Sequence, residues 1–322
     1  MSTASVQRSN LAGALCAVVA MVCFSINDVG IKFLSDRYAL HQVILMRSVI
    51  GIAVFAAVIM PLSGGLSVLH TRRPVMHILR GFCVVMANMC LFLGLAAMPI
   101  ADAVAIFFVS PLVISVFSVV FLGEKVGPRR WAAIAVGFVG VLVIVKPGTS
   151  AFQAASLLPM VAAVLYAALH MMTRRIGGTE SAATMAFYIQ VTFILVSIVF
   201  GLAVGGGQLA GTGDASLEFL LRAWIVPERG DLALLTVLGV SIAFGGFFIS
   251  QAYRISEAAF AAPFEYVAMP MAIFWGVTVF GTWPDPTAWI GIVLIIGSGL
   301  YLLWRETRPD TAPALDAPNY RR

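Results

Sequence analysis

Charged residues are scarce in this chain. Lys, Arg, Asp and Glu together make up 11% of its 322 residues, whereas hydrophobic residues make up 61%. A soluble domain is about one-quarter charged, because its surface has to face water. A soluble fold cannot hide so many apolar side chains. The composition therefore predicts an integral membrane protein whose apolar surface faces lipid.

Motifs for catalysis and metal binding are also missing. The chain contains no His-Glu-x-x-His, no Walker A glycine loop and no Gly-x-Ser-x-Gly elbow. Their absence argues against a metalloprotease, an ATPase and a serine hydrolase. We therefore expect a protein that is not an enzyme, with no catalytic residues, no metal and no cofactor.

Only four cysteines are present, and their spacing does not indicate a disulfide framework. Cys16 and Cys23 lie seven residues apart in the first apolar run, and Cys83 and Cys90 lie seven apart in the third. Residues at this spacing share one face of a helix. We interpret them as small apolar side chains. A metal or redox site between the two helices is the alternative.

The apolar residues form ten runs, most of them close to the roughly 20 residues that a membrane-spanning helix needs. Strands of a β-barrel would need runs of about ten alternating residues, and these runs are longer and apolar all round. Turn residues such as Met98-Pro99 and Gly177-Gly178 separate them. We predict an all-α integral membrane protein with ten transmembrane helices, at residues 11–33, 41–61, 75–97, 101–121, 131–146, 155–174, 182–204, 232–253, 259–280 and 287–304.

The start of the chain resembles a signal peptide, because Arg8 precedes an apolar run. That run extends from Leu11 to about Leu34 and carries polar residues near its end. It is too long for the apolar part of a signal peptide, and no small-x-small cleavage site follows it. We expect an uncleaved first helix.

Basic residues indicate how the helices are oriented, since loops on the cytoplasmic side carry an excess of Lys and Arg. With the N-terminus inside, the inner side receives most of the 20 Lys and Arg residues. The outer side receives only Arg37, Lys146, Arg222 and Arg229. The net charge of +5 thus reflects loop clusters rather than a nucleic-acid site. We expect a multi-pass protein with both termini cytoplasmic, a lipid bilayer and a small molecule as partners, and no nucleic acid. Whether it forms a homodimer is left open.

The two halves of the chain repeat one pattern. When Pro111 is aligned with Pro270, both segments continue through a Pro and a Trp into a Gly-rich final helix. Five helices per unit is an odd number, so the second unit enters the membrane from the opposite side. Such inverted repeats are typical of alternating-access transporters, which bind substrate near the midplane between the halves. We predict two inverted five-helix repeats, at residues 10–148 and 149–304, with cytoplasmic tails at 1–9 and 305–322.

One long connection, at about residues 205–231, interrupts the second repeat on the outer side. Its segment 217–226 predicts a short amphipathic helix at the interface, with Trp224 at the depth of the headgroups. We favour an interfacial linker, and a lid is the alternative.

These features together resemble the EamA-type members of the drug/metabolite transporter superfamily, over about residues 10 to 305. The residues that carry the resemblance are Phe24-Ser25-x-Asn27-Asp28-x3-Lys32, Arg47, His77-Ile78-Leu79-Arg80-Gly81, Pro111, Phe121-Leu122-Gly123-Glu124-Lys125, Gly137-x2-Gly140, Lys146-Pro147-Gly148, Ala262-Pro263-Phe264-Glu265-Tyr266 and Pro270. Thr282 departs from the pattern, because a Gly-Glu is expected there in the second half. The long connection at 205–231 is a second departure.

The resemblance is greatest to the branch that includes S-adenosylmethionine uptake and riboflavin transporters. It implies a secondary transporter in the plasma membrane, which is the inner membrane of a bacterium. The implied substrate is a small polar organic metabolite such as S-adenosylmethionine, riboflavin or an amino-acid-like compound. A channel or facilitator without ion coupling is the alternative, although no repeated filter or ring of like residues is visible.

Ionisable side chains inside apolar runs are costly in a bilayer, which makes them candidates for function. Asp28 and Arg47 share a depth near the outer side, where an ion pair is plausible. Arg80 and Glu265 share a depth near the inner side, and we favour a mixed role in which Glu265 pairs with Arg80 as a gate when substrate is absent. Binding of a cationic substrate group or of a proton by Glu265 is the alternative. Two such layers would suit gates that open alternately; structural pairs that lock the bundle are the alternative.

Polar residues and two prolines complete the candidates. A Pro within a helix removes one backbone hydrogen bond, which widens a cavity, permits rocking or only kinks the packing. Hydrogen bonds between helices are the alternative role for the polar side chains. The substrate or gating candidates are Asn27, Asp28, Lys32, Arg47, Arg80, Asn88, Pro111, Tyr166, His170, Gln190, Gln251, Glu265, Tyr266 and Pro270.

Overall fold

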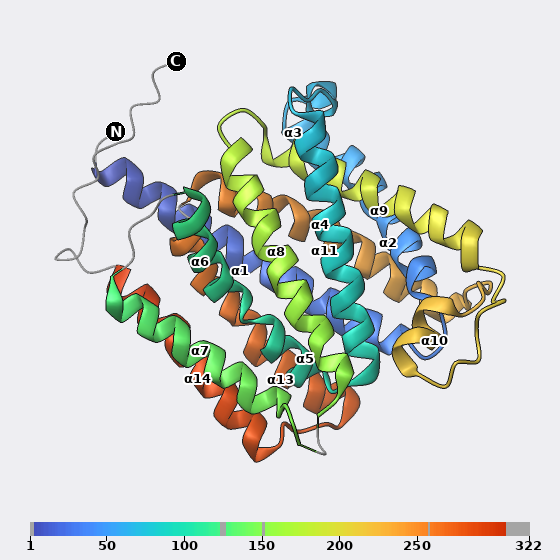
Figure 1. Ribbon diagram of the computed structural model, residues 1–322. Coiled ribbons are helices and arrows are strands. Elements are labelled where there is room, and N and C mark those ends of the chain that lie inside the picture. The colour runs from blue at the N-terminus through green and yellow to red at the C-terminus, as the bar shows by residue number, and fades with distance from the viewer. Residues whose placement is uncertain (1–2, 123–126, 150–151, 257, 307–322) are drawn as a thin grey trace.

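The computed structural model describes residues 3–122, 127–149, 152–256 and 258–306, and all regular structure within these ranges is helical (Figure 1). The expected turn at Glu124-Lys125 and the C-terminal tail from residue 307 lie outside the described residues.

The first half of the chain begins with a helix that starts well before the expected residue 11. The helices of this half follow the apolar runs closely, and a π-helical turn (η1) continues α2 into α3. The elements are α1 (Thr3–Leu34), α2 (Leu40–Val54), η1 (Phe55–Ile59), α3 (Met60–Leu62), η2 (Gly65–Leu69), α4 (Pro74–Ala97), α5 (Ile100–Phe107), α6 (Ser110–Leu122) and α7 (Pro128–Val145).

The second half contains the same kinds of element and one additional short helix, α10, in the long connection. Its elements are η3 (Ala154–Ser156), α8 (Leu157–Ile176), α9 (Ala182–Val204), α10 (Ala215–Leu221), α11 (Arg229–Ile255), α12 (Ala258–Ala261), η4 (Ala262–Val267), α13 (Ala268–Phe280) and α14 (Pro286–Glu306).

Within the described ranges, seven helical segments are long and apolar enough to cross a membrane. Three shorter apolar helices lie at Trp131–Val145, Phe264–Phe280 and Pro286–Tyr301. The ten apolar runs expected from the sequence all fall on these segments. Ten crossings in two inverted repeats remain a prediction, because length and composition alone do not orient a helix in a bilayer.

Two helices that the sequence predicted as continuous are interrupted. The run at 101–121 breaks at Phe108 and Val109, just before Pro111, whose ring nitrogen has no hydrogen to donate. The run at 259–280 contains a 3-10 stretch, η4, between α12 and α13. In the alignment of Pro111 with Pro270, Phe108 falls on Val267, the last residue of η4, so the two interruptions overlap.

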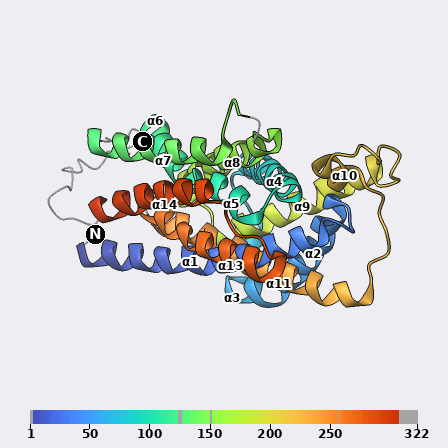
Figure 2. The same cartoon turned by 90° about the horizontal axis from the view of Figure 1, so that it is seen from below.

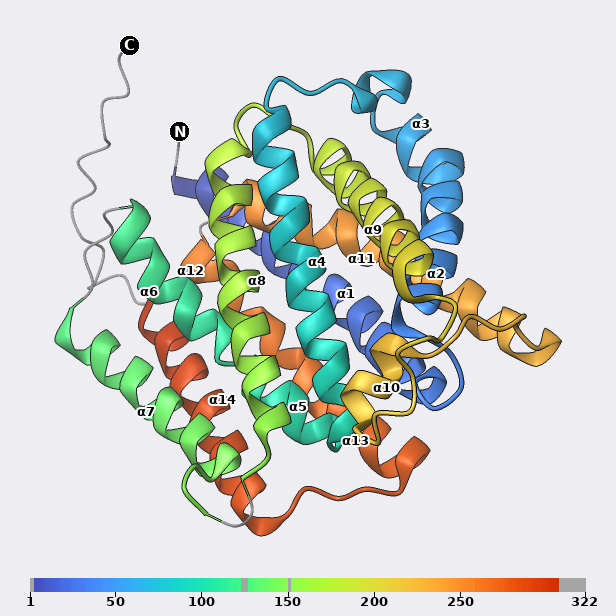
Figure 3. The same cartoon turned by 45° about the vertical axis from the view of Figure 1, so that its right-hand side comes forward.

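Helices from the two halves pack in matching pairs. α1 lies along α11 and α4 lies along α8, while α2 packs on both α9 and α11. Figure 2 shows the helices in two layers, with α4, α6, α7 and α8 in one layer and α1, α11 and α13 in the other. Figure 3 shows α7 and α14 side by side at one edge of the molecule, away from α2 and α9.

Glycines allow α7 and α14 to approach closely. A Cβ atom on Gly140 would lie 2.8 Å from the carbonyl oxygen of Gly291, and a Cβ on Gly291 would lie 2.6 Å from that of Gly140. Neither contact leaves room for a larger residue. Small residues at such an interface are typical of helices that associate within a membrane.

The long connection is tied to the α1–α2 turn. Trp224 donates its indole N–H to Nδ1 of His41 at 2.8 Å, and Gln42 exchanges two hydrogen bonds with the backbone of Ile225, of 2.5 and 3.2 Å. Arg222 donates to the carbonyl of Ser35 at 2.7 Å. The predicted short helix is present as α10, although it begins at Ala215 and ends at Leu221.

Candidate functional site

A central cavity of about 90 Å³ lies between α1, α2, α4, α8, α9 and α11. Helices of both halves contribute to its wall. Seven of the predicted site residues line this cavity: Asn27, Asp28, Arg47, Asn88, Tyr166, His170 and Gln190.

Arg47 is the central cation of the cavity and is fully buried. Its Nη1 donates to the side-chain oxygen of Asn27, and its Nη2 donates to that of Asn88 at 3.3 Å. The guanidinium carbon lies 5.2 Å from the ring centre of Phe92 and 5.3 Å from that of Phe193. A cation between two aromatic faces is stabilised by their negative potential, which helps to offset its lost hydration.

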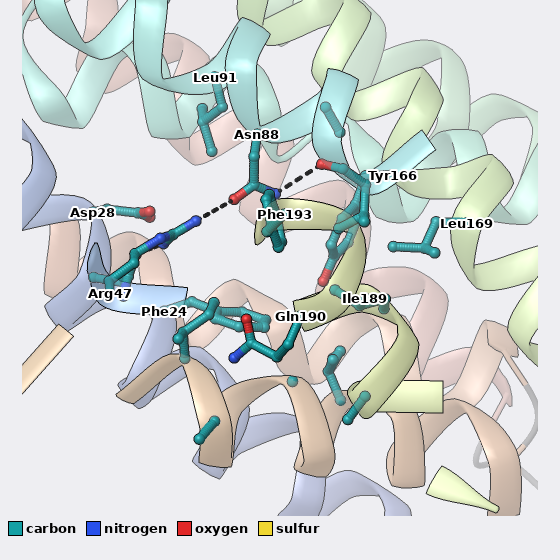
Figure 4. Close-up of a pocket in the computed structure, with 18 of the residues that line it drawn as sticks. Phe24, Asp28, Arg47, Asn88, Leu91, Tyr166, Leu169, Ile189, Gln190 and Phe193 are labelled. Carbon is teal, nitrogen blue, oxygen red and sulfur yellow. Dashed lines mark hydrogen bonds between the residues drawn. The ribbon is translucent and has the colours of Figure 1, made fainter. Parts of the chain in front are cut away.

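Asp28 faces the same cavity beside Arg47 (Figure 4). The predicted ion pair is not formed: no nitrogen of Arg47 lies within 4 Å of the Asp28 carboxylate, among the contacts of the described residues. The reason is Asn27, the preceding residue, which takes the Nη1 hydrogen bond. Asn27 is itself held in place, because its amide nitrogen donates to the carbonyl of Leu238 at 3.1 Å.

Several polar atoms on the cavity wall have no partner among the described residues. These are Nε of Arg47, both amide atoms of Gln190 and both ring nitrogens of His170. Buried polar atoms are rarely left without hydrogen bonds, and exceptions often mark sites for a ligand or water. The cavity thus offers one cation, one carboxylate and unused hydrogen-bonding groups.

Aromatic rings form much of the remaining wall, and most of them are not among the residues predicted from the sequence. Phe24, Phe107 and Phe193 line the cavity beside Tyr166. The ring of Phe107 meets that of Tyr166 edge to face, with centres 5.1 Å apart. Phenylalanines in apolar runs carry no signal that separates a cavity wall from a lipid-facing surface.

A second buried polar cluster lies outside the cavity. Arg80 is buried and its Nε donates to Oγ1 of Thr173 at 3.1 Å. Nearby, Nε2 of His77 lies 3.5 Å from a carboxylate oxygen of Glu180. Thr71 and the backbone N–H of Arg72 donate to the other oxygen of Glu180, at 3.1 and 3.0 Å. This cluster joins α4, α8 and the turn before α9.

The predicted pairing of Arg80 with Glu265 is wrong. Glu265 accepts a hydrogen bond from the hydroxyl of Tyr253, and no described cation lies within ion-pair distance of it. The ring of Tyr253 stacks on His170, with centres 3.9 Å apart. Arg80 and Glu265 therefore have different partners, Thr173 on α8 for Arg80 and Tyr253 on α11 for Glu265, and they do not meet.

Lys32 has a structural environment away from the cavity. Its ammonium donates to the carbonyls of Leu95 and Met98, at 2.6 and 2.8 Å, and lies 5.4 Å from the ring centre of Phe280. These carbonyls belong to the C-terminal end of α4, where helical carbonyls lack partners and a cation is favourable.

The other predicted residues also lie outside the cavity wall. Pro111 is buried at the start of α6, whereas Pro270 is exposed. Gln251 is half-buried on α11. The hydroxyl of Tyr266 is buried without a partner among the described residues, and its ring packs against Gly299.

Helices suited to a membrane that surround a cavity with both charged and aromatic walls define a multi-pass membrane transporter for small molecules, rather than an enzyme. Comparison with known proteins identifies the family. The model of the EamA-like transporter family matches residues 11–146. This chain belongs to the EamA-like transporter family.

Curated relatives match almost the whole chain. A riboflavin transporter of Rhizobium johnstonii is 30% identical over 302 residues, which is 94% of each chain. An S-adenosylmethionine uptake transporter of Rickettsia prowazekii is 29% identical over 94% of this chain and 95% of the relative. A pseudopaline exporter of Pseudomonas aeruginosa is 25% identical over 88% of this chain and 93% of the relative. One solved structure, with 18% identity and a TM-score of 0.67, covers 94% of this chain and 99% of its own, which supports the fold.

Proposed function

We propose that this chain carries a small polar organic metabolite across the bacterial inner membrane by alternating access between two inverted five-helix repeats. The observation that carries the proposal is the cavity, where Arg47 and Asp28 face one space without pairing with each other. Charged side chains that do not pair with each other are free to bind groups of opposite charge on a ligand.

Packing between the halves supports the repeat. If the first five helices exchange places with the last five, α1 takes the place of α8 and α11 that of α4. The contact of α1 with α11 then becomes the contact of α8 with α4, and both are observed. The interrupted helices also fall at corresponding positions. Interrupted helices at matching places in two halves are a feature of secondary transporters, where they lie near the substrate.

The cavity wall favours one class of substrate. Arg47 suits a carboxylate or another anionic oxygen, and Asp28 suits a cationic or hydrogen-bond-donating group. The rings of Phe24, Phe107 and Tyr166 suit a planar heterocycle. S-adenosylmethionine, the compound named for one relative, has all of these groups. Riboflavin, named for another, supplies the planar heterocycle and hydroxyl donors but no anionic oxygen. Amino-acid-like compounds match only the charged part of the wall.

The test is uptake of radiolabelled riboflavin and S-adenosylmethionine into liposomes that contain the purified protein. We expect saturable uptake of one of them, and a thermal stabilisation of the protein by the same compound. Arg47→Lys keeps the charge but loses the planar fork, so uptake should fall strongly. Arg229→Lys, at an exposed position outside the cavity, is the matched control.

Two results would contradict the proposal. Unchanged uptake and unchanged stabilisation in Arg47→Lys would remove this residue from the site. Uptake that does not saturate and shows no exchange between labelled and unlabelled compound would favour a channel.

A further inference from the structure

Glu265 is the most completely buried carboxylate in the described part of the chain. It lies in the 3-10 interruption η4, with no exposed surface. One carboxylate oxygen accepts the hydrogen bond from Tyr253, and the other has no partner among the described residues. It is not part of the cavity wall.

No cation faces this carboxylate among the described side chains. From α8 it meets Tyr166, from α11 Tyr253, and within η4 Tyr266. His170 on α8 stacks on the ring of Tyr253. The described residues of α6, α12 and α13 include no ionisable group, and α14 carries the exposed Tyr301, with Arg305 and Glu306 at its C-terminal end. α1 also packs on η4. Beyond Arg8 in its first turns, its ionisable side chains are Cys16, Cys23, Asp28 and Lys32, and none of these four bonds to Glu265.

An ionised carboxylate is poorly stabilised in such a place. Burial removes its hydration, and one phenolic hydrogen bond replaces only a part of it. The neutral acid fits better, because one oxygen still accepts from Tyr253 while the other carries the proton. In this conformation the site therefore favours a bound proton.

Tyr166 gives the carboxyl group a short route to the cavity. It lines the cavity and also faces Glu265. The 3-10 stretch that holds Glu265 lies between two helical segments, α12 and α13, so a small change in its winding would alter the exposure of the carboxyl group. Gly299 leaves room for the ring of Tyr266 beside it, since a Cβ there would lie 2.0 Å from a ring carbon.

We propose that Glu265 is a proton-binding site that couples transport to the proton gradient, an inference that rests on the proposed transport function. The carboxyl group is protonated while it is buried as seen here. It releases the proton in a conformation that exposes η4 to water. Asp28 does not share this role: it lies on the cavity wall with the guanidinium of Arg47 close by, and is assigned to the substrate.

The proton itself is detected without any substrate. Infrared difference spectra of the reconstituted protein, recorded between acid and alkaline buffer, should contain the carbonyl stretch of a protonated carboxyl group. This band should be absent from Glu265→Gln. It should persist in Glu218→Gln, a partly exposed position where the amide oxygen can still accept the bonds from Thr212. Persistence of the complete band in Glu265→Gln would overturn the proposal.

Coupling is measured with labelled riboflavin or S-adenosylmethionine, whichever the wild type transports. An imposed pH gradient should accelerate wild-type uptake and have no effect on Glu265→Gln, which should still exchange internal for external compound. Uptake by Glu265→Gln that still responds to the gradient would also overturn the proposal. If Glu265→Gln does not fold, Tyr253→Phe replaces it. This variant loses the hydrogen bond, and the infrared band should shift to higher frequency; an unshifted band would count against Glu265 as its source.

The two proposals fail in different ways. If neither compound is transported or bound by the wild type, the proposed function is contradicted for these substrates. The infrared result then still decides whether Glu265 holds a proton.

Discussion

Asn27 bonds the guanidinium of Arg47 and thereby separates it from Asp28, the next residue along α1. The separation leaves a cation and a carboxylate facing one cavity without neutralising each other. A pair that was already joined would have to be broken before either group could bind a substrate.

The first prediction concerns this separation. Asn27→Ala should allow Arg47 to swing toward Asp28 and pair with it. A hydrogen bond to a charged group is worth about 1.5–3 kcal/mol, so substrate affinity should fall by roughly 10- to 100-fold. The measurement is the dissociation constant of the transported compound in purified protein. Asn27→Asp would hold Arg47 with a second charge, and is also expected to weaken binding. Wild-type affinity in Asn27→Ala would show that the separation is irrelevant.

A second prediction distinguishes a structural role from a site role for Lys32. Lys32→Met keeps the length of the side chain but leaves the carbonyls of Leu95 and Met98 without their donor. Leaving a buried acceptor without its donor lowers the free energy of unfolding by about 1–3 kcal/mol. We expect a lower melting temperature and an unchanged KM for uptake. A raised KM at normal stability would instead indicate contact with the substrate.

The polar residues of the cavity were easier to predict from the sequence than the residues they contact. Arg47, Asn88 and Gln190 stand out because each is polar within an apolar run. The partners of these residues were harder to predict, because the position of a residue along its helix gives its depth in the membrane but does not show which helices lie beside it. Arg80 and Glu265 share an expected depth, yet Arg80 bonds Thr173 and Glu265 bonds Tyr253.

The interruptions of the helices were predictable only in part. Pro111 and Pro270 indicate a disturbed backbone. They do not say that the first break is confined to Phe108 and Val109, whereas the second winds a 3-10 stretch around Glu265. The 3-10 stretch packs against α1 and α14, and these contacts between distant parts of the chain cannot be read from the prolines.

A third prediction concerns acid stability at the turn before α14. Lys146 donates to Asp285 at 2.6 Å, and this bond, together with those from Ala288 and Thr287, lowers the pKa of Asp285 to about 2. Its unfolded pKa is near 4. The carboxylate therefore stabilises the fold above about pH 4, and the contribution is lost as the pH falls toward 2.

Lys146→Met should remove most of this pH dependence. We expect the melting temperature of the wild type to fall more steeply than that of the variant between about pH 4 and pH 2. Arg129→Met, at an exposed position on α7, is the control. Parallel curves for the wild type and Lys146→Met would contradict the role of the pair.

A fourth prediction concerns topology. Reporter fusions after residue 73 or 175 should give a cytoplasmic signal, and fusions after residue 149 or 213 an external one. The inverted repeat requires this alternation, because each half contributes five crossings. A cytoplasmic signal at 213 would overturn the inverted arrangement, and an external signal at 73 would reverse the orientation drawn from the basic residues.

The last prediction decides whether the long connection is a linker or a lid. Its bonds to the α1–α2 turn come from several separate residues: Arg222 to Ser35, Trp224 to His41 and Ile225 to Gln42. These bonds favour the linker over the lid, because they hold the connection to α1 and α2 so that it moves together with them. A disulfide between Gln42→Cys and Ile225→Cys would fix this contact. A fixed linker should retain most of its uptake after oxidation, whereas a lid should lose uptake and recover it with a reductant. The single variant Ile225→Cys, treated in the same way, controls for oxidation of the four native cysteines.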